Sequence, residues 1–374
     1  MTPLNDICHQ DTARTIILNS FNRDRLASTY LFFGIDGVGK WAAAIALAAL
    51  TNCQEPQKDD SGRITDACGR CRNCRQIIRL NFPEMHFALP LPPHRSESDA
   101  DKLTQEYLEQ KKDEPYAIIT SPRQLTIPVN TARAIRRKAA IKPPAGTKRI
   151  IVFYRMENML PASADSLLKL IEEPPPETII ILTAESPNHL LPTIQSRSQK
   201  IRFKPLPTDI IARYLVDHYR TPEKKAEFYA RLAGGSLGQA LLSLDEDDRS
   251  SQRQTAFLMF KSLFGDDTPA AVASLNELLN PRDRGGTEQI LKYWQSFLSD
   301  LIIIKYAGEP TDIINTDLLA EMEKLAGRIT GSDSFMELQN EIKKVILLLK
   351  RNVHIRPAMT SMALNFRRHL GQSS

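Results

Sequence analysis

The sequence predicts an α/β domain over residues 1–205, a small helical domain over 206–247 and an all-α domain over 248–374. The first prediction depends on short, almost wholly apolar strands that alternate with helical patterns, which is typical of a parallel sheet covered on both faces. The other two depend on the loss of strand patterns after Lys204–Pro207 and on the helical periodicity that follows. A chain of 374 residues is long enough for two or three such domains.

Strands and helices of the first domain can be placed from their residue patterns. Each strand pattern is rich in β-branched or aromatic residues: Thr29–Phe33, Ile150–Tyr154 and Thr178–Leu182. The Ala/Leu-rich stretch after Lys40 favours a helix, because alanine and leucine are strong helix formers. A second helix is predicted for Ala162–Glu173, which places Leu167, Leu168 and Ile171 on one face. The three prolines that follow end it.

The loop after the first strand, GIDGVGKW, matches the phosphate-binding pattern G-x-x-x-x-G-K-[ST] except at its last residue. Four residues are candidates for binding nucleotide phosphates, through backbone N–H groups and a lysine charge: Gly34, Gly37, Gly39 and Lys40. The hydroxyl that normally ends the pattern helps to hold Mg²⁺, and Trp41 replaces it here. An alternative is that the glycines are present only because the tight strand-to-helix turn needs them.

The strand Ile150–Tyr154 should be followed by an acidic residue that completes the Mg²⁺ site, but Arg155 follows it instead. A cation at this position repels Mg²⁺, and Glu157 lies two residues further on. Together with Trp41 this makes two independent defects in one metal site, so we expect no ATP hydrolysis by this chain. Whether ATP or ADP binds without hydrolysis stays open, with phosphate affinity much reduced in the absence of metal.

The cysteine spacing C-x14-C-x2-C-x2-C indicates a metal site. Its four members lie in a predicted zinc module of about residues 52–80: Cys53, Cys68, Cys71 and Cys74. Four thiolates suit tetrahedral Zn²⁺ and leave no open coordination position, so the zinc is predicted to be structural. The alternatives are free thiols on a loop or redox-active pairs. Cys8 lies outside the cluster, and we expect it to be a buried free thiol.

Composition and charge exclude several classes of protein. Hydrophobic residues make up 42% and charged residues 25%, as in ordinary globular proteins. The N-terminus lacks the pattern of a secretory signal, and the most apolar helical run, Trp41–Leu50, is too short to cross a bilayer. We therefore expect a cytoplasmic protein with no membrane partner. The 49 Lys and Arg against 44 Asp and Glu permit nucleic-acid contact without requiring it.

Two charged segments are conspicuous. The stretch Arg133–Arg149 carries seven cations and no acidic residue, and on a helix it turns Ala132, Ile135 and Ala139 inward and the cations outward. Such a face can contact a DNA backbone, or it can be a solvated or inter-subunit face. Residues 92–115 mix acidic and basic side chains, and we interpret them as a surface insertion or a mobile loop.

The run Ser163–Phe203, SADSLLKLIEEPPPETIIILTAESPNHLLPTIQSRSQKIRF, resembles bacterial clamp-loader subunits of the AAA+ class. Those subunits carry a helix ending in L-L-K-x-L-E-E-P-P-P and, further on, the motif S-R-C. That motif stands here as Ser196-Arg197-Ser198. The cysteine cluster after the phosphate-loop helix is also typical of that group. The resemblance implies an AAA+ (P-loop type) domain with a zinc-binding insertion, a helical lid domain and a helical collar domain.

The resemblance also implies a role for Arg197. In that family the arginine of the S-R-C motif approaches the nucleotide of a neighbouring subunit, so Arg197, with Ser196 beside it, is the predicted catalytic element acting in trans. The alternative is that Arg197 only pairs with a local carboxylate or caps the end of its helix. Motor subunits also keep an arginine in the lid where this chain has Gly238. The implied partners are the gamma/tau and delta subunits of the clamp loader, the sliding clamp, and primer–template DNA in the assembled complex.

Two other interpretations stay open. In the first, the chain is an active gamma/tau-type clamp-loader ATPase that uses Glu157 as a substitute metal ligand. In the second, it is a zinc-stabilised DNA-binding module unrelated to replication. Metal-dependent nucleotide binding would distinguish the first. Strong, salt-sensitive DNA binding by the isolated chain would distinguish the second.

Overall fold

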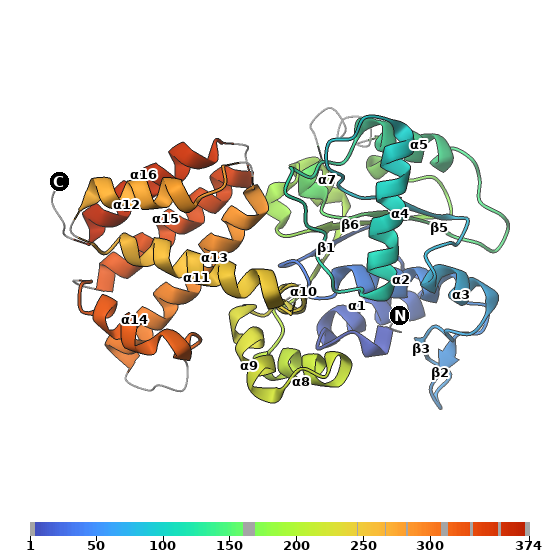
Figure 1. Ribbon diagram of the computed structural model, residues 1–374. Helices are drawn as coiled ribbons and strands as arrows, with labels where there is room; N and C mark the ends of the chain where they lie inside the picture. The colour runs from blue at the N-terminus through green and yellow to red at the C-terminus, as the bar shows by residue number, and fades with distance from the viewer. Residues whose placement is uncertain are drawn as a thin grey trace. The chain divides into compact units, whose positions relative to one another are not determined.

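The computed structural model describes residues 4–159, 169–244, 246–265, 267–281, 283–307, 313–329, 332–350 and 353–370. The chain forms two compact units (Figure 1). One unit contains residues 1–119 and 124–242, and the other contains residues 120–123 and 243–374. The predicted lid residues therefore belong to the same unit as the sheet, and the division into three domains stays a prediction.

A five-stranded parallel sheet forms the centre of the first unit, in the spatial order β4-β5-β6-β1-β7. Its strands are β1 Thr29–Phe33, β4 Met85–Ala88, β5 Arg149–Phe153, β6 Thr178–Ala184 and β7 Gln199–Arg202. β5 and β6 are buried at every position, as expected for strands covered on both faces. The predicted parallel α/β sheet is confirmed.

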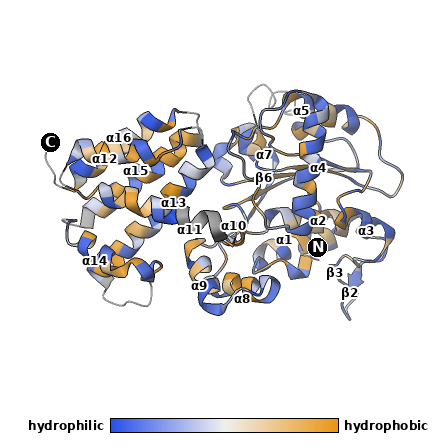
Figure 2. Ribbon diagram, in the orientation of Figure 1, coloured by the Kyte–Doolittle hydropathy of each residue, from blue (hydrophilic) through white to orange (hydrophobic). Residues whose placement is uncertain are grey.

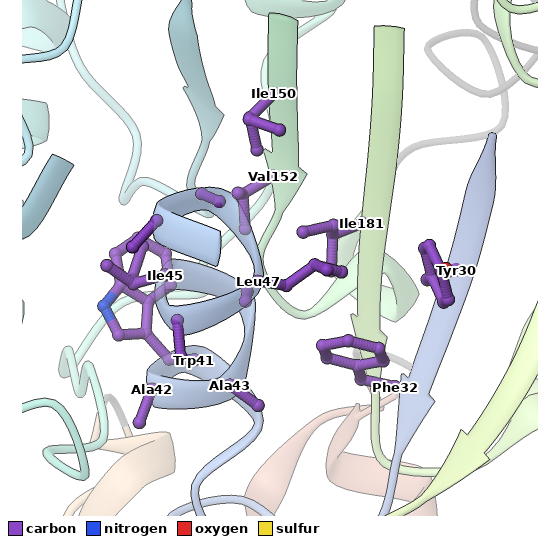
Figure 3. Close-up of a cluster of buried hydrophobic side chains, with 14 of the residues drawn as sticks. Tyr30, Phe32, Trp41, Ala42, Ala43, Ile45, Leu47, Ile150, Val152 and Ile181 are labelled. Carbon is purple, nitrogen blue, oxygen red and sulfur yellow. The ribbon is translucent and has the colours of Figure 1, made fainter. Parts of the chain in front are cut away.

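One face of the sheet is covered by helices α1 to α4. Their bounds are α1 Asp11–Asn22, α2 Lys40–Asn52, α3 Arg72–Ile78 and α4 Glu97–Asp113. The same unit also contains the short helix η1 Leu4–Asp6 and a hairpin of two strands, β2 Gln57–Lys58 and β3 Ile64–Asp66. Helix α2 is buried at twelve of its thirteen positions. Figure 3 shows Leu47 of α2 facing Val152 of β5 and Ile181 of β6. The phosphate loop is therefore attached to the most deeply buried helix of this unit.

The other face is covered by α5 Val129–Ala139 and α7 Pro192–Arg197. As predicted, Ala132, Ile135 and Ala139 are buried in α5, and its cations point outward. The helix predicted for Ala162–Glu173 lies largely outside the described residues, and so do Leu167 and Leu168. The described residues 169–172 are helical, with Leu170 and Ile171 buried on this face. The short helices η2 Met156–Asn158 and η3 Pro187–His189 follow β5 and β6.

Of the two interpretations of residues 92–115, the mobile loop is wrong for most of the segment, because it forms the 17-residue helix α4, and this helix is buried only at Lys111. Ser96 caps its N-terminus by accepting a hydrogen bond from the backbone N–H of Asp99. The helix is mostly hydrophilic in Figure 2. Its few apolar residues nevertheless pack against the core that α2 contacts: Ala100, Leu103, Tyr107 and Leu108.

Three helices complete the first unit: α8 Thr208–Tyr219, α9 Glu223–Leu232 and α10 Leu237–Leu242. The turn before α10 contains Gly234 and Gly235, both with positive φ. A side chain at Gly235 would clash with Pro205, so this turn requires glycine for space as well as for conformation.

The second unit is helical in all its described elements. They are α11 Glu246–Ser262, α12 Thr268–Leu278, α13 Arg284–Ile302, the π-helix η4 Ile303–Ala307, η6 Thr316–Leu318, α14 Leu319–Ala326, α15 Ser332–Lys350 and α16 Ile355–His369. Buried aromatic rings form its core: Phe260, Trp294, Phe297 and Phe366. Within the described part of the chain, a search for a helix able to cross a bilayer finds none.

Candidate functional site

The phosphate loop joins β1 to α2 through three glycines in unusual conformations. Gly34, Gly37 and Gly39 have φ of 145°, 77° and 104°, which L-residues rarely adopt. Gly39 is the left-handed residue at the N-cap of α2. The turn therefore needs its glycines for purely conformational reasons, whether or not phosphate binds.

Lys40 is bound to its own loop. Its Nζ donates to the carbonyl oxygens of Gly34 and Ile35, the second at 2.9 Å, and lies 3.2 Å from a carboxylate oxygen of Asp36. The residue is only 3% exposed. The charge that neutralises phosphate in a working loop is neutralised here by the loop itself.

Trp41 stands where the metal-binding hydroxyl should be, and its side chain is part of the core. It is 2% exposed, its ring stacks on Phe87 of β4 at 5.3 Å, and it meets Tyr154 edge-on at 5.7 Å. The indole is drawn against α2 in Figure 3. An aromatic residue is fixed here by packing and offers no oxygen ligand to a metal.

Arg155 follows β5, at the position where an acidic metal ligand is expected, and forms an ion pair with Asp36. Its Nε lies 3.0 Å from the second carboxylate oxygen of Asp36, and its guanidinium also donates to the carbonyl of Ile119 at 3.3 Å. Burial alone would raise the pKa of Asp36, but the charges of Arg155 and Lys40 outweigh it and hold that pKa below its ordinary value. Arg155 has φ 55°, a strained conformation for a non-glycine residue.

Glu157 is poorly suited to replace a metal-binding carboxylate. Burial and the neighbouring Asp36 charge raise its pKa to about 7, although Arg155 opposes them. One of its oxygens accepts from the backbone N–H of Glu185 at 3.4 Å. A carboxyl with a pKa this high is only partly ionised at neutral pH and is therefore a weaker Mg²⁺ ligand than an ordinary carboxylate.

The predicted lid contacts the phosphate loop directly, through the turn before α10 and the start of that helix. The hydroxyl of Ser236 donates to the carbonyl of Asp36 at 2.5 Å, and the backbone N–H of Gly238 donates to the carbonyl of Gly37 at 3.1 Å. A side chain on Gly37 would come within 2.6 Å of the Ser236 hydroxyl. Gly238 cannot carry a side chain either, because Tyr116 and Ile118 fill the space beside it. The motor-type lid arginine would not fit at this position.

The four predicted zinc ligands come together. Their sulfur atoms all lie within 4.8 Å of one another, and those of Cys68 and Cys74 are 3.9 Å apart. Tetrahedral zinc with Zn–S bonds of about 2.3 Å needs sulfurs about 3.8 Å apart, so the donor set fits. Backbone N–H groups point at three of the sulfurs, as expected for thiolates: Cys68 to Cys53, Cys71 to Cys68, and Cys74 to Cys71. Cys8 is a free thiol, as predicted, but it is only partly buried.

Arg197 ends α7 with its side chain 44% exposed, and it lies apart from the loop. One of its guanidinium nitrogens is 3.6 Å from Glu172 and also donates to the carbonyl of Thr193 at 3.4 Å. Ser196 donates to the same carbonyl at 3.1 Å. Ser198, at the cysteine position of the motif, is buried and bonds to Ile194.

The sheet separates Arg197 from the phosphate loop. β1 and β7 run parallel, with Tyr30 opposite Gln199 and Phe33 opposite Arg202. The loop follows the carboxyl end of β1, whereas Arg197 precedes the amino end of β7, and the strands between span about 13 Å. The two features therefore lie at opposite ends of two neighbouring parallel strands.

Sequence reasoning missed several residues of this site. Lys111 of α4 is 2% exposed, and its ammonium lies 4.4 Å from the ring centre of Tyr154 and 5.6 Å from that of Trp41. Nothing in the polar pattern of residues 92–115 indicated a buried lysine. Asp36 was visible inside the loop, but its pairing with Arg155 depends on two segments that meet only in the fold.

Comparison with known proteins gives a consistent result. Residues 9–207 match the sequence model of the family described as "DNA polymerase III, delta subunit". DNA polymerase III subunit delta' of Bacillus subtilis is 24% identical, over 95% of this chain and 95% of that protein. Subunit delta' of Pseudomonas aeruginosa is 30% identical over 57% of this chain and 55% of its own length.

Other relatives are named as tau or gamma subunits. DNA polymerase III subunit tau of Salmonella typhimurium is 25% identical over 79% of this chain, which spans only 42% of that relative. Among solved structures, a DNA polymerase III gamma subunit-related protein of Thermotoga maritima covers 96% of this chain and 99% of its own. Its identity is 13% and its TM-score is 0.41, so the superposition is loose.

Proposed function

This chain belongs to the DNA polymerase III delta-subunit family, and from that premise we propose that it is a non-hydrolysing, delta-prime-type subunit of the clamp loader. In this role it would work in the cytoplasm, in a ring with gamma/tau and delta subunits, and would support loading of the sliding clamp onto primed DNA. Its AAA+ domain, lid and collar, and a structural zinc ion held by the four clustered cysteines, belong to the same proposal.

The ion pair of Arg155 with Asp36 is the observation that carries the proposal. It puts a paired guanidinium where an ATPase needs a metal-binding carboxylate, and Trp41 removes the second metal ligand. A charge pair this buried is costly to break, because separating it leaves an unpaired charge in the protein interior. These contacts favour a site without ATP turnover.

The position of Arg197 supports action on another subunit. An exposed guanidinium at the end of the strands opposite the chain's own phosphate loop is badly placed for its own site and accessible to a neighbour's. Arginine fingers supplied in trans raise phosphoryl-transfer rates by about 10³–10⁵. The present partner, Glu172, is itself about one third exposed, so leaving it costs little.

Reconstitution with gamma/tau and delta subunits tests this proposal. Arg197→Ala is expected to assemble normally and to lower DNA-stimulated ATPase activity at least tenfold at the one interface that it serves. The matched control is Arg213→Ala, which also removes an exposed arginine, here from α8, and should leave the activity unchanged. Normal turnover by the Arg197→Ala ring would remove the finger role.

The tau-named relatives make a gamma/tau-type motor the second candidate. A motor requires Mg²⁺-dependent ATP binding by the isolated chain. Calorimetric titration of ATP with and without Mg²⁺ should detect no metal-dependent binding if the proposal is right. Turnover faster than that of a Lys40→Ala variant would favour the motor instead.

A further inference from the structure

The segment that follows α4 crosses the space between the phosphate loop and the lid. We define the strap as residues 111–119, which comprise the end of α4 and the chain up to Ile119. Six of its nine residues are buried, namely Lys111 and the run 115–119. Such burial is unexpected for a connection that follows a strongly polar helix, so its contacts need an explanation.

At one end the strap is fixed to the degenerate metal site. The ammonium of Lys111 lies over the rings of Trp41 and Tyr154 and donates to the strap's own carbonyls at Pro115 and Ala117. The carbonyl of Ile119 accepts from Arg155. Both residues that replace the metal ligands therefore contact the strap.

In its middle the strap meets the phosphate loop and the N-terminal segment. The ring of Tyr116 lies beside Gly39, so that a side chain at Gly39 would come within 3.2 Å of it. The Tyr116 hydroxyl accepts from the backbone N–H of Cys8 at 3.0 Å. The mouth of the loop is thus covered by a side chain from the same polypeptide.

On its other side the strap holds the lid. The carboxylate of Glu114 accepts from the hydroxyls of Tyr219 at 2.5 Å and Tyr214 at 3.4 Å, both on α8. Tyr116 meets Tyr214 edge-on at 5.7 Å. The backbone of Tyr116 and the side chain of Ile118 also pack against Gly238 at the start of α10.

We propose that the strap is the chain's own occupant of the space between phosphate loop and lid, and that it holds the lid closed without nucleotide. In proteins that close around a ligand, the ligand's contacts with both parts stabilise the closed state. Here residues 111–119 make contacts with both parts permanently. This goes beyond the proposed function, because it concerns the lid of the free chain and does not involve Arg197.

Hydrogen exchange of the full-length protein tests the strap. Glu114→Ala removes the acceptor of two lid hydroxyls, and we expect exchange of the α8 and α10 amides to rise on the order of tenfold while that of β1 and β6 is unchanged. Glu109→Ala is the matched control, since it removes the same charge from the exposed face of α4 and should have no effect. In the wild type, Mg-ATP should not alter lid exchange.

A milder variant guards against misfolding. Tyr219→Phe removes one hydroxyl and should raise the rate of lid amide exchange less than Glu114→Ala does. The double variant should exchange only slightly faster than Glu114→Ala, because both changes break the same hydrogen bond. Equal lid exchange in Glu114→Ala and Glu109→Ala would overturn the proposal. So would protection of the lid by Mg-ATP, or a rise of the same size throughout the sheet.

Discussion

Single residues decide what the phosphate loop can do. Trp41 occupies the position where the pattern has a metal-binding hydroxyl. It is also a core side chain, because Phe87 and Tyr154 pack on its ring. Asp36 is both a loop residue and the anion for Lys40 and Arg155. Each residue that departs from the phosphate-binding or metal-binding pattern therefore also makes a structural contact.

Trp41→Thr restores the hydroxyl of the motif and tests this dual role. We expect a loss of about 3–5 kcal/mol in the free energy of unfolding, because a large aromatic side chain leaves a filled core. We expect no gain of ATPase activity, because Arg155 still occupies the metal position. Denaturant unfolding and a phosphate-release assay measure the two quantities. Trp41→Phe, which keeps a ring, should lose much less stability.

Lys111 predicts a pH dependence of stability. Burial lowers its pKa to about 7 in the folded chain, against an ordinary value near 10.5. Between these two values the unfolded chain binds the extra proton, so stability should rise as the pH rises from about 7 toward 10. Below pH 7 Lys111 is protonated in both the folded and the unfolded chain, so the folded chain bears the full free-energy cost of burying the charge.

Lys111→Met isolates this contribution, because methionine keeps an apolar stem of similar length. The rise in melting temperature between pH 7 and pH 9 should be smaller in this variant than in the wild type. The control is Lys112→Met, at the neighbouring and partly exposed position, which should follow the wild-type profile. Identical profiles for all three proteins would show that Lys111 does not titrate in this range.

Secondary-structure elements show where sequence patterns suffice and where they do not. The strands β1, β5 and β6 could be predicted because nearly every residue in them is apolar. Helix α4 could not, since its burial depends on four weakly patterned residues in a polar sequence. The outward cations of α5 could be predicted, because its three apolar residues repeat at helical spacing.

The zinc module gives a prediction for the segment around α3. Cys71→Ser should reduce bound zinc from about one ion per chain to a small fraction and should make residues 54–66 sensitive to protease, because metal binding stabilises such small modules directly. Metal analysis and limited proteolysis measure both effects. Cys8→Ser should keep the full zinc content, since Cys8 lies outside the cluster. Full zinc retention by Cys71→Ser would contradict the four-cysteine site.

Helix α5 gives a prediction for DNA. If its exposed arginines contact phosphates in the assembled ring, Arg136→Ala with Arg137→Ala should lower DNA affinity at low salt and reduce the slope of log K against log salt by up to about 2. The control pair Arg23→Ala with Arg25→Ala removes the same exposed charge after α1. An unchanged slope in the α5 variant would indicate a solvated or inter-subunit face.

At the scale of the whole molecule, the sequence predicted which residues belong to a metal or phosphate motif but not which segments cover them. The cysteine cluster follows from spacing alone, because its ligands are close in the chain. The contact of the lid with the loop joins residues about 200 positions apart, Ser236 and Asp36, and depends on packing that no local pattern encodes. Long-range contacts of this kind need the fold.

The two compact units predict independent folding. A fragment of residues 1–242 contains the sheet, the predicted zinc module and the predicted lid, and we expect it to bind zinc and to melt cooperatively. It should fail to enter the ring with gamma/tau and delta subunits if the second unit is the collar. Circular dichroism and size-exclusion chromatography with those subunits measure both outcomes. Co-elution of the fragment with the ring would contradict the collar assignment.

The ion pair between Arg155 and Asp36 has an evolutionary consequence. In a descendant with an acidic residue at position 155, two carboxylates would come together with Lys111 and Lys40 left to balance them, while Trp41 still offered no metal ligand. Restoring position 41 alone would open a hole in the core. Under the proposed function, each single substitution therefore costs stability before it supplies a complete metal site, and such a chain is expected to go on depending on ATP hydrolysed by its neighbours.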